Sequence, residues 1–403
     1  MSRAPQNERS NQDRQAWIDK ELSIIKQDGL LRTQRVRSLQ SQAKTIELNG
    51  QLLVDFSSND YLGLAGELST ELHQDPIWNT NWGSGASPLI TGRTEAHQEL
   101  EQELSCFKHA EAALAFSTGY AANVGAITAL TGAGDVIFSD AKNHASIIDG
   151  CRLSKANVVI YRHNDIDHLS ELLAGVTDVR RRLIVTDTLF SMDGDFAKLP
   201  QLAELAETHN AMLLVDEAHA TGVFGENGRG LAEHFGCEAA IDVSVGTLSK
   251  ALGSIGGFIT GSRLLIDLLV NKARPYIYST AMPAVCARAG VLALKRVAAE
   301  PQRRELLLSN VGHLVSALRE AGLISNGDAG AEDGNSQIIP IMLGHPEKAL
   351  QLSLSLREAG MNVPAIRPPT VPQQESLLRI SLSSQHTSTQ LDRLVAGLVQ
   401  NYS

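Results

Sequence analysis

Three ionisable residues could act together on one ligand. Each of them follows an apolar run of the chain. Asp216 and His219 lie in Val-Asp-Glu-Ala-His, directly after the apolar run Ala211–Val215. Lys250 lies in Thr-Leu-Ser-Lys-Ala-Leu-Gly, after a second such run at residues 242–245. A lysine amine can form a Schiff base with an aldehyde, and a carboxylate can keep a pyridine nitrogen protonated. These residue types favour a site for pyridoxal 5'-phosphate (PLP).

The residues around Lys250 support this interpretation. Thr247 and Ser249 provide hydroxyls for a phosphate group, and a glycine-rich stretch follows. Asp216 opposite a protonated ring nitrogen would form a charge-assisted pair, which makes the ring a strong electron sink. An isolated lysine is ordinarily a solvated surface residue. Its place after an apolar run makes that alternative less favourable here.

Other polar residues follow apolar runs in the same way. Segment 116–123 passes from an apolar run into a helical pattern, so the backbone N–H groups of Gly119 and Tyr120 could bind phosphate at a helix N-terminus. A glycine there is equally good turn chemistry, so this pattern alone leaves both interpretations open. His144 and Ser191 also follow apolar runs, and we expect both to face the same crevice.

Short apolar runs alternate with helical patterns between about residue 95 and residue 262. This alternation predicts an α/β fold, in which a mostly parallel central sheet is flanked by helices on both faces. Ligands of such sheets bind at the carboxyl ends of the strands. The expected strands are Ala112–Phe116, Val136–Phe138, Val158–Tyr161, Leu183–Thr186, Met212–Val215, Val243–Val245 and Phe258–Thr260.

The remaining chain predicts two smaller parts. Apolar positions in Trp17–Gly29 fit a helix that stops at the glycine, and two short strands follow within residues 45–56. Helical stretches and apolar runs near the C-terminus predict a small α+β domain. We therefore expect an N-terminal helix and arm (residues 1–58), a large PLP-binding domain (59–283) and a C-terminal small domain (284–403).

Composition excludes several classes of function. The chain has 403 residues, 43% of them hydrophobic, and a formal net charge of -10, which argues against a nucleic-acid-binding surface. The four cysteines form no CxxC pair, so neither a metal site nor a disulfide framework is expected. The polar N-terminal segment lacks an apolar leader, and no stretch approaches a membrane span. We expect a cytoplasmic protein that binds neither nucleic acid nor membrane.

Seven motifs give the chain a resemblance to a known family. In their order and spacing they resemble the α-oxoamine synthases, a group within the fold-type I PLP-dependent enzymes. The resemblance extends from the N-terminal arm almost to the C-terminus. The motifs are Asn59-Asp-Tyr-Leu-Gly-Leu64, Ser117-Thr-Gly-Tyr-Ala-Ala-Asn123, Asn143-His-Ala-Ser146, Phe190-Ser-Met-Asp-Gly-Asp195, Asp216-Glu-Ala-His-Ala-Thr-Gly222, Thr247-Leu-Ser-Lys-Ala-Leu-Gly253 and Tyr278-Ser-Thr-Ala-Met-Pro283.

The resemblance implies a catalytic role for four residues. Lys250 matches the lysine that bonds to the cofactor aldehyde and later acts as the base, and Asp216 matches the partner of the pyridine nitrogen. His219 matches a hydrogen-bond donor to the phenolic oxygen. His144 matches the histidine that stacks on the ring and contacts substrate, and Ser191 is expected beside the cofactor.

The resemblance also implies a phosphate site shared between subunits. Gly119, Tyr120 and Thr247 match the residues that bind the cofactor phosphate. Ser279 and Thr280 match the pair that family members contribute to the phosphate of the neighbouring subunit. If this holds, the active unit is a homodimer.

Substrate choice is implied by the C-terminal segment. The run at residues 365–372 is most similar to the branch of the family that joins L-alanine to a pimeloyl thioester, on coenzyme A or acyl carrier protein, in biotin synthesis. Arg379 matches the arginine that binds the amino-acid carboxylate, for which a bidentate guanidinium is suited. Thr370 and Arg32 match acyl-substrate contacts, and Asn59 is also expected to contact substrate.

One departure from the family pattern and several alternatives bear on this expectation. Where relatives usually have Gly-x-Gly-Gly-Ser or Gly-x-Gly-Gly-Thr followed by a basic residue or glycine, this chain has Gly83-Ser-Gly-Ala-Ser-Pro88. Pro88 fixes φ and removes a backbone donor in a loop expected near the substrate. A sister synthase using glycine with acetyl- or succinyl-CoA, or serine with a long acyl chain, would share every PLP residue. An aminotransferase would share the lysine and aspartate. A silent subunit or PLP-sensing regulator is the non-enzymatic alternative, but Lys250 is present and no residues remain for a DNA-binding domain.

Overall fold

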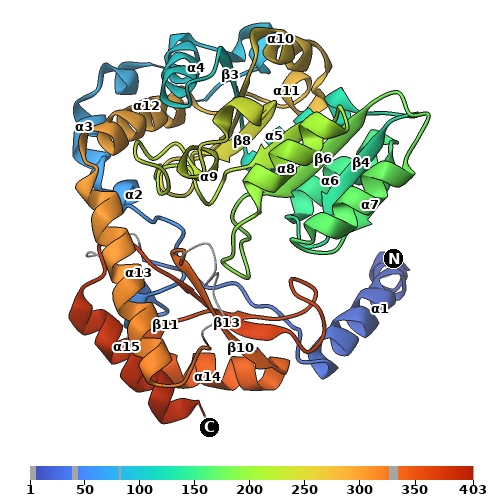
Figure 1. Ribbon diagram of the computed structural model, residues 1–403. Coiled ribbons are helices and arrows are strands. Elements are labelled where there is room, and N and C mark those ends of the chain that lie inside the picture. Colours follow the sequence, from blue (N-terminus) through green and yellow to red (C-terminus); the bar gives the residue numbers. More distant parts are fainter. Residues whose placement is uncertain (1–5, 39–43, 81–82, 326–334, 403) are drawn as a thin grey trace, which may run out of the picture. The chain divides into compact units, whose positions relative to one another are not determined.

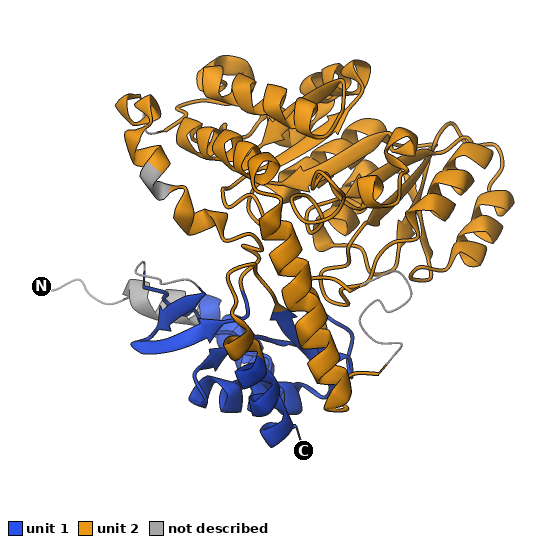
Figure 2. Ribbon diagram, turned by 60° about the vertical axis from the view of Figure 1, so that its left-hand side comes forward, with its two compact units in different colours: residues 1–57, 340–380, 392–403 blue, residues 58–339, 381–391 orange. Residues whose placement is uncertain are grey.

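The computed structural model describes residues 6–38, 44–80, 83–325 and 335–402, which form two compact units (Figure 2). Unit 2 contains residues 58–339 and 381–391. Unit 1 contains residues 1–57, 340–380 and 392–403. This division differs from the expected three parts, because the chain from 284 to 339 groups with the large unit. Helix α12 (Ala284–Ala299) explains the difference, since it packs along α4 (Glu95–Phe107) of that unit.

A seven-stranded sheet forms the centre of unit 2 (Figure 1). The strand order is β3-β9-β8-β7-β6-β4-β5, and only β9 runs antiparallel to its neighbours. The predicted α/β class with a mostly parallel sheet is therefore confirmed. The strands are β3 (Ala112–Phe116), β4 (Val136–Asp140), β5 (Asn157–Tyr161), β6 (Arg182–Asp187), β7 (Met212–Asp216), β8 (Val243–Thr247) and β9 (Gly257–Gly261).

The apolar runs form strands because both faces of the sheet are covered. Leu214 of β7 packs in a core cluster with Ala126 and Ile127 of the overlying helix α5 (Gly119–Leu130). Leu213 and Val215 are equally buried and, by the alternation of a strand, point to the other face. There α8 (Leu199–Thr208) contacts β7, and α7 (Ile166–Gly175) contacts β5 and α8. Burial on both faces requires a continuous apolar run rather than an alternating one.

Helices and short helical turns make up most of the rest of unit 2. They join successive strands or lie at the ends of the sheet. Those not yet given are α2 (Leu64–Glu67), α3 (Ser69–Gln74), η1 (Pro76–Asn79), η2 (Pro88–Gly92), α6 (Ala145–Ser154), α9 (Leu231–His234), η3 (Glu238–Ala240), α10 (Arg263–Lys272), α11 (Arg274–Ile277) and α13 (Gln302–Glu320).

Unit 1 is assembled from three separate chain segments around two small sheets. One sheet has the order β1-β2-β11 and the other β10-β13-β12, and helix α14 packs on β11 and β12. Among the described residues, no helix of either unit is long and apolar enough to cross a membrane. The elements are α1 (Gln6–Gln27), β1 (Thr45–Leu48), β2 (Gln51–Asp55), β10 (Ile338–Gly344), α14 (Pro346–Glu358), β11 (Met361–Asn362), β12 (Ala365–Ile366), β13 (Ser376–Ser381) and α15 (Ser388–Asn401).

The N-terminal helix is longer than expected. It begins at Gln6 rather than near Trp17, because an established helix adds one hydrogen bond for each further residue, even where that residue is polar. Its C-terminal end is as predicted. Gly29 follows the last turn with φ of 67°, a left-handed conformation that favours glycine.

Candidate active site

The carboxyl end of β7 places a buried carboxylate at the edge of the sheet. Asp216 is the last residue of β7 and is 5% exposed. Its Oδ1 accepts a hydrogen bond from the Ala218 N–H at 2.8 Å, and its Oδ2 accepts one from Asn123 Nδ2 at 2.6 Å. Both oxygens are therefore fixed in direction before any ligand binds. A carboxylate fixed in this way can receive a charged N–H donor with little reorganisation.

Lys250, His144 and two carboxylates lie within electrostatic range of one another. Asp187 ends β6 and pairs in register with Asp216 on β7. Burial raises the pKa of Asp187 well above its ordinary value, the charge of Asp216 raises it further, and the charge of Lys250 acts in the opposite direction. Lys250 comes three residues after Thr247, the end of β8. The predicted lysine and aspartate thus meet at one edge.

His144 is linked to Asp216 through a chain of hydrogen bonds. The Asn123 amide donates to Asp216 and to Ser146 Oγ at 2.9 Å, and Ser146 Oγ lies 2.7 Å from His144 Nδ1. The Ser146 N–H also points at His144 Nδ1, at 3.3 Å. His144 Nδ1 is therefore an acceptor, and the neutral ring carries its hydrogen on Nε2. Sequence reasoning missed Asn123 and Ser146.

The environment of His144 favours this neutral form. Surrounding protein atoms lower the pKa of His144 below its ordinary value, and the positive charge of Lys250 lowers it further, while Asp216 acts in the opposite direction. Part of the side chain nevertheless remains exposed to solvent. A neutral ring with an open surface fits the predicted stacking role.

His219 is held by a residue that the sequence analysis did not select. The Tyr61 hydroxyl lies 2.7 Å from His219 Nδ1 and 3.1 Å from Asn59 Oδ1. Tyr61 is fully buried, and His219 is 6% exposed. Asn59, expected to contact substrate, thus belongs to the same network as His219. The available signal was the large polar aromatic residue in the Asn59-Asp-Tyr motif.

The start of α5 and the end of β8, where the phosphate cradle was predicted, lie side by side. Thr118 caps the helix by accepting from the Ala121 N–H at 3.0 Å, and the first backbone N–H groups, at Gly119 and Tyr120, have no acceptor within the helix. A Cβ added to Gly119 would lie 3.4 Å from Thr247 Cβ, so the glycine keeps the space between these elements open. A helix N-terminus beside a threonine hydroxyl suits a phosphate dianion. The residues present therefore fit PLP.

The side chain of Tyr120 points elsewhere. Its hydroxyl donates to Asp149 on α6, and this bond raises the pKa of Tyr120 above its ordinary value. The predicted contribution of Tyr120 to the cradle is therefore left to its backbone N–H. Ser191 lies on the loop after β6, half-buried between Leu189 and Phe196, which form a bridge that closes the loop.

Ser279 and Thr280 follow α11, where the chain is largely exposed. Thr280 is exposed, and the neighbouring Tyr278 is 70% exposed. Within the described part of the chain, neither Ser279 nor Thr280 makes a hydrogen bond with the other predicted cofactor residues. The next residue, Ala281, donates its N–H to the Ala86 carbonyl at 3.1 Å.

Pro88 does not disturb the backbone of its loop. It is the first residue of the short helix η2, with Ser87 as the cap. A proline at this position sacrifices no hydrogen bond, because the N–H groups of a first helical turn lack acceptors within the helix. The departure from the family pattern is therefore compatible with a regular turn.

Three further predicted residues lie in unit 1. The Arg32 guanidinium contacts the Pro368 carbonyl at 3.5 Å, and the Thr370 N–H donates to the Arg367 carbonyl at 3.1 Å. Arg32 and Thr370 thus share the turn at residues 367–370. Arg379 lies on β13, is 5% exposed and donates its N–H to the Pro364 carbonyl at 3.1 Å, just before β12.

Sequence reasoning missed a further cation at this turn. Arg367 donates to the Gly29 carbonyl, and burial lowers the pKa of Arg367, with the charges of Arg32 and Arg35 adding to the effect. Three arginines therefore lie within electrostatic range of one another in unit 1. A group of cations at this turn suits an acidic ligand.

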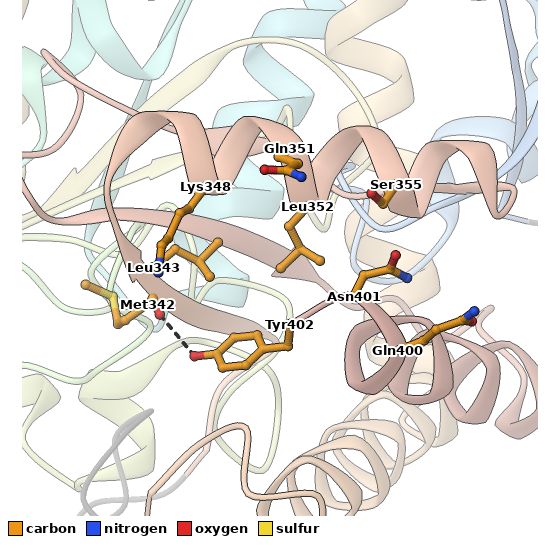
Figure 3. Close-up of a pocket in the computed structure, with 9 residues that line it drawn as sticks. All are labelled: Met342, Leu343, Lys348, Gln351, Leu352, Ser355, Gln400, Asn401 and Tyr402. Atoms are coloured by element: carbon orange, nitrogen blue, oxygen red, sulfur yellow. Dashed lines mark hydrogen bonds between the residues drawn. The ribbon is translucent and has the colours of Figure 1, made fainter.

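A separate hollow in unit 1 is lined by none of these residues. It has a volume of about 320 Å³ and lies between the end of β10, α14 and the end of α15 (Figure 3). The Tyr402 hydroxyl closes one side by donating to the Met342 carbonyl at 3.3 Å. None of its nine lining residues was predicted as a site residue. The shape of a cavity alone therefore does not identify the predicted site residues.

The sheet and the residues at its carboxyl edge define the class of protein. The protein is a fold-type I PLP-dependent transferase, and PLP is its cofactor. The family profile "Aminotransferase class I and II" matches residues 52–398. The chain belongs to this family.

Individual relatives confirm the resemblance seen in the motifs. An 8-amino-7-oxononanoate synthase from Anaeromyxobacter dehalogenans strain 2CP-1 is 46% identical over 95% of this chain and 94% of its own. One from Lysinibacillus sphaericus is 43% identical over 94% of this chain and 96% of its own.

Solved structures with the same fold include enzymes of two names. A serine palmitoyltransferase from S. paucimobilis with a bound PLP-myriocin aldimine superimposes with a TM-score of 0.90, is 30% identical and covers 97% of this chain and 98% of its own. An 8-amino-7-oxononanoate synthase from Francisella tularensis gives a TM-score of 0.74 at 28% identity, over 87% of this chain and 98% of its own.

Proposed function

We propose that this chain condenses L-alanine with a pimeloyl thioester and releases carbon dioxide and the free thiol. The product is 8-amino-7-oxononanoate, an intermediate of biotin synthesis. The observation that carries the proposal is the position of the Asp216 carboxylate. Asn123 holds it by a hydrogen bond, and Asp216 and Lys250 both act electrostatically on His144 and Asp187. The chain is also 46% identical to a curated 8-amino-7-oxononanoate synthase.

The cofactor and two residues divide the central chemistry between them. When bound, PLP supplies an electron sink for the electron pair left on a substrate carbon. The Lys250 amine would hold the cofactor aldehyde, and as a free amine it would remove the proton from the alanine α-carbon. The Asp216 carboxylate keeps the ring nitrogen protonated, and its bonds to Asn123 and Ala218 hold it in that direction.

Two histidines orient the reacting groups. With Nδ1 accepting from Ser146, His144 presents its Nε2–H to the substrate side, where it can stabilise the acyl oxygen electrostatically. The Tyr61 hydroxyl donates its one hydrogen to Asn59 Oδ1 and therefore accepts from His219 Nδ1–H, which leaves Nε2 of His219 to hydrogen-bond the phenolic oxygen of the cofactor. Gly119, with Tyr120 and Thr247, binds the phosphate, and Ser191 lies beside the ring.

Substrate recognition is assigned to four of the predicted residues. Arg379 pairs with the alanine carboxylate, because its planar guanidinium can donate two parallel hydrogen bonds. Arg32 and Thr370, which share one turn, contact the acyl chain, and the charge of Arg32 suits the free carboxylate of a pimeloyl group. Asn59 contacts substrate from the network of Tyr61.

The quaternary structure and location belong to the same proposal. We propose a homodimer in which Ser279 and Thr280 of one subunit serve the cofactor phosphate of the other. The exposure of Thr280 supports this role. We also propose a cytoplasmic enzyme, and the four free cysteines support a reducing compartment. Size-exclusion chromatography with light scattering tests the dimer.

A sister α-oxoamine synthase is the second candidate. The TM-score of 0.90 with serine palmitoyltransferase favours it, because enzymes with different substrates share this fold. Glycine C-acetyltransferase and 5-aminolevulinate synthase activities belong to the same alternative. The higher identity to 8-amino-7-oxononanoate synthases favours the first proposal.

Thiol release discriminates these candidates. The PLP-loaded protein is assayed with L-alanine, glycine or L-serine, each against pimeloyl-, succinyl-, acetyl- and palmitoyl-CoA. Rapid release with alanine and pimeloyl-CoA alone is the expected result. Preference for another amino acid or acyl chain would assign a sister activity, and repeating the assay with pimeloyl-acyl carrier protein identifies the preferred donor.

A further inference from the structure

His163 is a half-buried histidine that the chemistry described so far does not use. It follows β5, and its two ring nitrogens contact two different carboxylates: Nδ1 lies 2.9 Å from Asp140 Oδ1, and Nε2 lies 2.8 Å from Asp195 Oδ2. An ionised carboxylate only accepts hydrogen bonds, so each nitrogen must donate. A neutral imidazole has a single N–H. The geometry therefore requires a doubly protonated ring.

The first of these carboxylates begins the turn that carries His144. Asp140 is the last residue of β4, and its side chain is 1% exposed. Its Oδ1 also accepts from the Lys142 N–H at 2.8 Å, and Asn143 and His144 follow directly. Asp140 thus fixes the start of the turn that leads to His144.

The second carboxylate lies on the loop that carries Ser191. The Phe190 N–H donates to the Asp195 carbonyl at 3.0 Å, and the Gly194 N–H donates to the Phe190 carbonyl at 2.9 Å, so this loop is closed on itself. The His163 ring lies edge-on to the Phe190 ring, with centroids 4.4 Å apart. His163 therefore contacts the loop at both of its ends.

Asp195 depends on few partners. Its Oδ2 accepts from His163 and from Asn164 Nδ2, the latter at 2.9 Å. Its Oδ1 is buried and has no hydrogen-bond partner among the described residues. Removing the charge of His163 would leave one ring N–H for two carboxylates, so either Asp140 or the half-buried Asp195 would lose its donor, which is costly.

We propose that His163 is a positioning residue, which holds the turn of His144 and the loop of Ser191 together at the carboxyl edge of the sheet. The importance of His144 and Ser191 rests on the proposed function. The link itself does not, because it consists of contacts within unit 2. His163 acts through Asp140 and Asp195 and touches no reacting group.

The link is sensitive to pH over a defined range. Burial acts to lower the pKa of His163, but the hydrogen bonds to Asp140 and Asp195 outweigh it and raise the pKa to about 9. Lys142 is paired with Asp193 at 2.5 Å, and Arg162 with Asp165 at 2.7 Å, so these neighbouring charges are compensated. The charged groups that contact His163 are Asp140, at the end of β4, and Asp195, in the loop. The other charged and titratable groups on the segments around it are Lys142, Tyr161, Arg162, Asp165 and Asp193.

Amide hydrogen exchange of the PLP-loaded, wild-type protein tests the link without substrate. After correction for the intrinsic pH dependence of exchange, protection of the amides of Phe190 and Gly194 should fall by about tenfold or more as the pH rises through about 9. Amides in the middle of β6 and β7 should show no such step. Protection of the loop that does not change across this range would overturn the proposal.

Substitution of His163 is the second test of the link. In His163→Gln, loop protection should already be low at neutral pH, and the step near pH 9 should disappear. His209→Gln, at the C-terminus of α8 on the opposite edge of the sheet, should retain the wild-type profile. Wild-type behaviour of His163→Gln would contradict the proposal. If that variant does not fold, the wild-type pH series still decides.

A cofactor readout separates this inference from the proposed function. The dissociation constant of PLP, measured by absorbance, should rise for His163→Gln and stay unchanged for His209→Gln. An unchanged constant for His163→Gln would show that the link does not reach the site. Absence of thiol release with alanine and pimeloyl-CoA would overturn the proposed function while leaving the exchange result intact.

Discussion

The carboxyl edge of the sheet in unit 2 and the turn at residues 367–370 in unit 1 are built differently. Asp216 and Asn123 are 5% and 1% exposed, and hydrogen bonds between different elements hold them. Arg32 and Thr370 are exposed, and each contacts a carbonyl group of this turn, at Pro368 and Arg367 respectively. At the sheet edge, packing holds the side chains in place. At the turn in unit 1, the side chains of Arg32 and Thr370 are exposed to solvent.

This difference has consequences for energetics. A hydrogen bond to a buried charge is costly to remove, because the partner is left desolvated, whereas an exposed ion pair contributes about 0–1 kcal/mol. We therefore expect substitutions at the sheet edge to affect the cofactor and the chemistry strongly. Substitutions of exposed residues at the turn in unit 1 should change substrate affinity by smaller factors.

The largest effect should follow loss of the lysine at the sheet edge. Lys250→Ala removes both the amine that holds the cofactor and the base, so turnover should fall by about 10³-fold or more. Thiol release under saturating substrates measures it. Lys272→Ala, on the exposed end of α10, should keep wild-type turnover. Turnover of Lys250→Ala within tenfold of wild type would contradict the role assigned to this residue.

A smaller but clear effect should follow loss of the amide that holds Asp216. Asn123→Ala removes a charge-assisted hydrogen bond of 2.6 Å and leaves the Asp216 carboxylate and Ser146 short of a donor. The PLP dissociation constant should rise by about 10- to 100-fold. Absorbance titration measures it, with Asn271→Ala on the exposed face of α10 as the control. Equal constants for both variants would remove Asn123 from the site.

The pH dependence of stability should reveal His163. Its folded pKa of about 9 lies above the ordinary value of 6.5, so its contribution to folding is fully present below about pH 6.5 and is lost as the pH rises through 9. The shift corresponds to at most about 3 kcal/mol of unfolding free energy. Urea unfolding of the wild type at several pH values measures the loss. His163→Gln should lack this part of the dependence, and identical curves for both proteins would contradict it.

The smallest effect should come from the exposed turn. Arg32→Ala should raise the KM for the pimeloyl thioester by about two- to fivefold with kcat unchanged, because the guanidinium is exposed to solvent. The KM for alanine should not change. Arg152→Ala, whose side chain is 76% exposed on α6, serves as the control. A large fall in kcat for Arg32→Ala would place this residue in the chemistry and weaken the contrast between the two regions.

The sequence alone predicted the fold of the sheet and the residues at its edge. Seven apolar runs became seven strands, and two of them extend past their expected ends, to Asp216 and to Thr247. Asn123 was missed, although a polar residue within the apolar helical stretch of α5 was a signal of a buried partner. Its partner lies 93 positions away, and their contact depends on how α5 packs over the sheet.

Local pattern determined what each segment of this protein would become. Runs of apolar residues set the strands, glycine and threonine set the start of α5, and polar residues after strand ends marked the chemistry, because these features act over a few neighbouring residues. Only the tertiary structure decided the strand order, the assembly of unit 1 from three segments, and the partners of Asp216, His219 and His163. Those contacts join positions far apart in the chain, and burial selects them only once the whole core has formed.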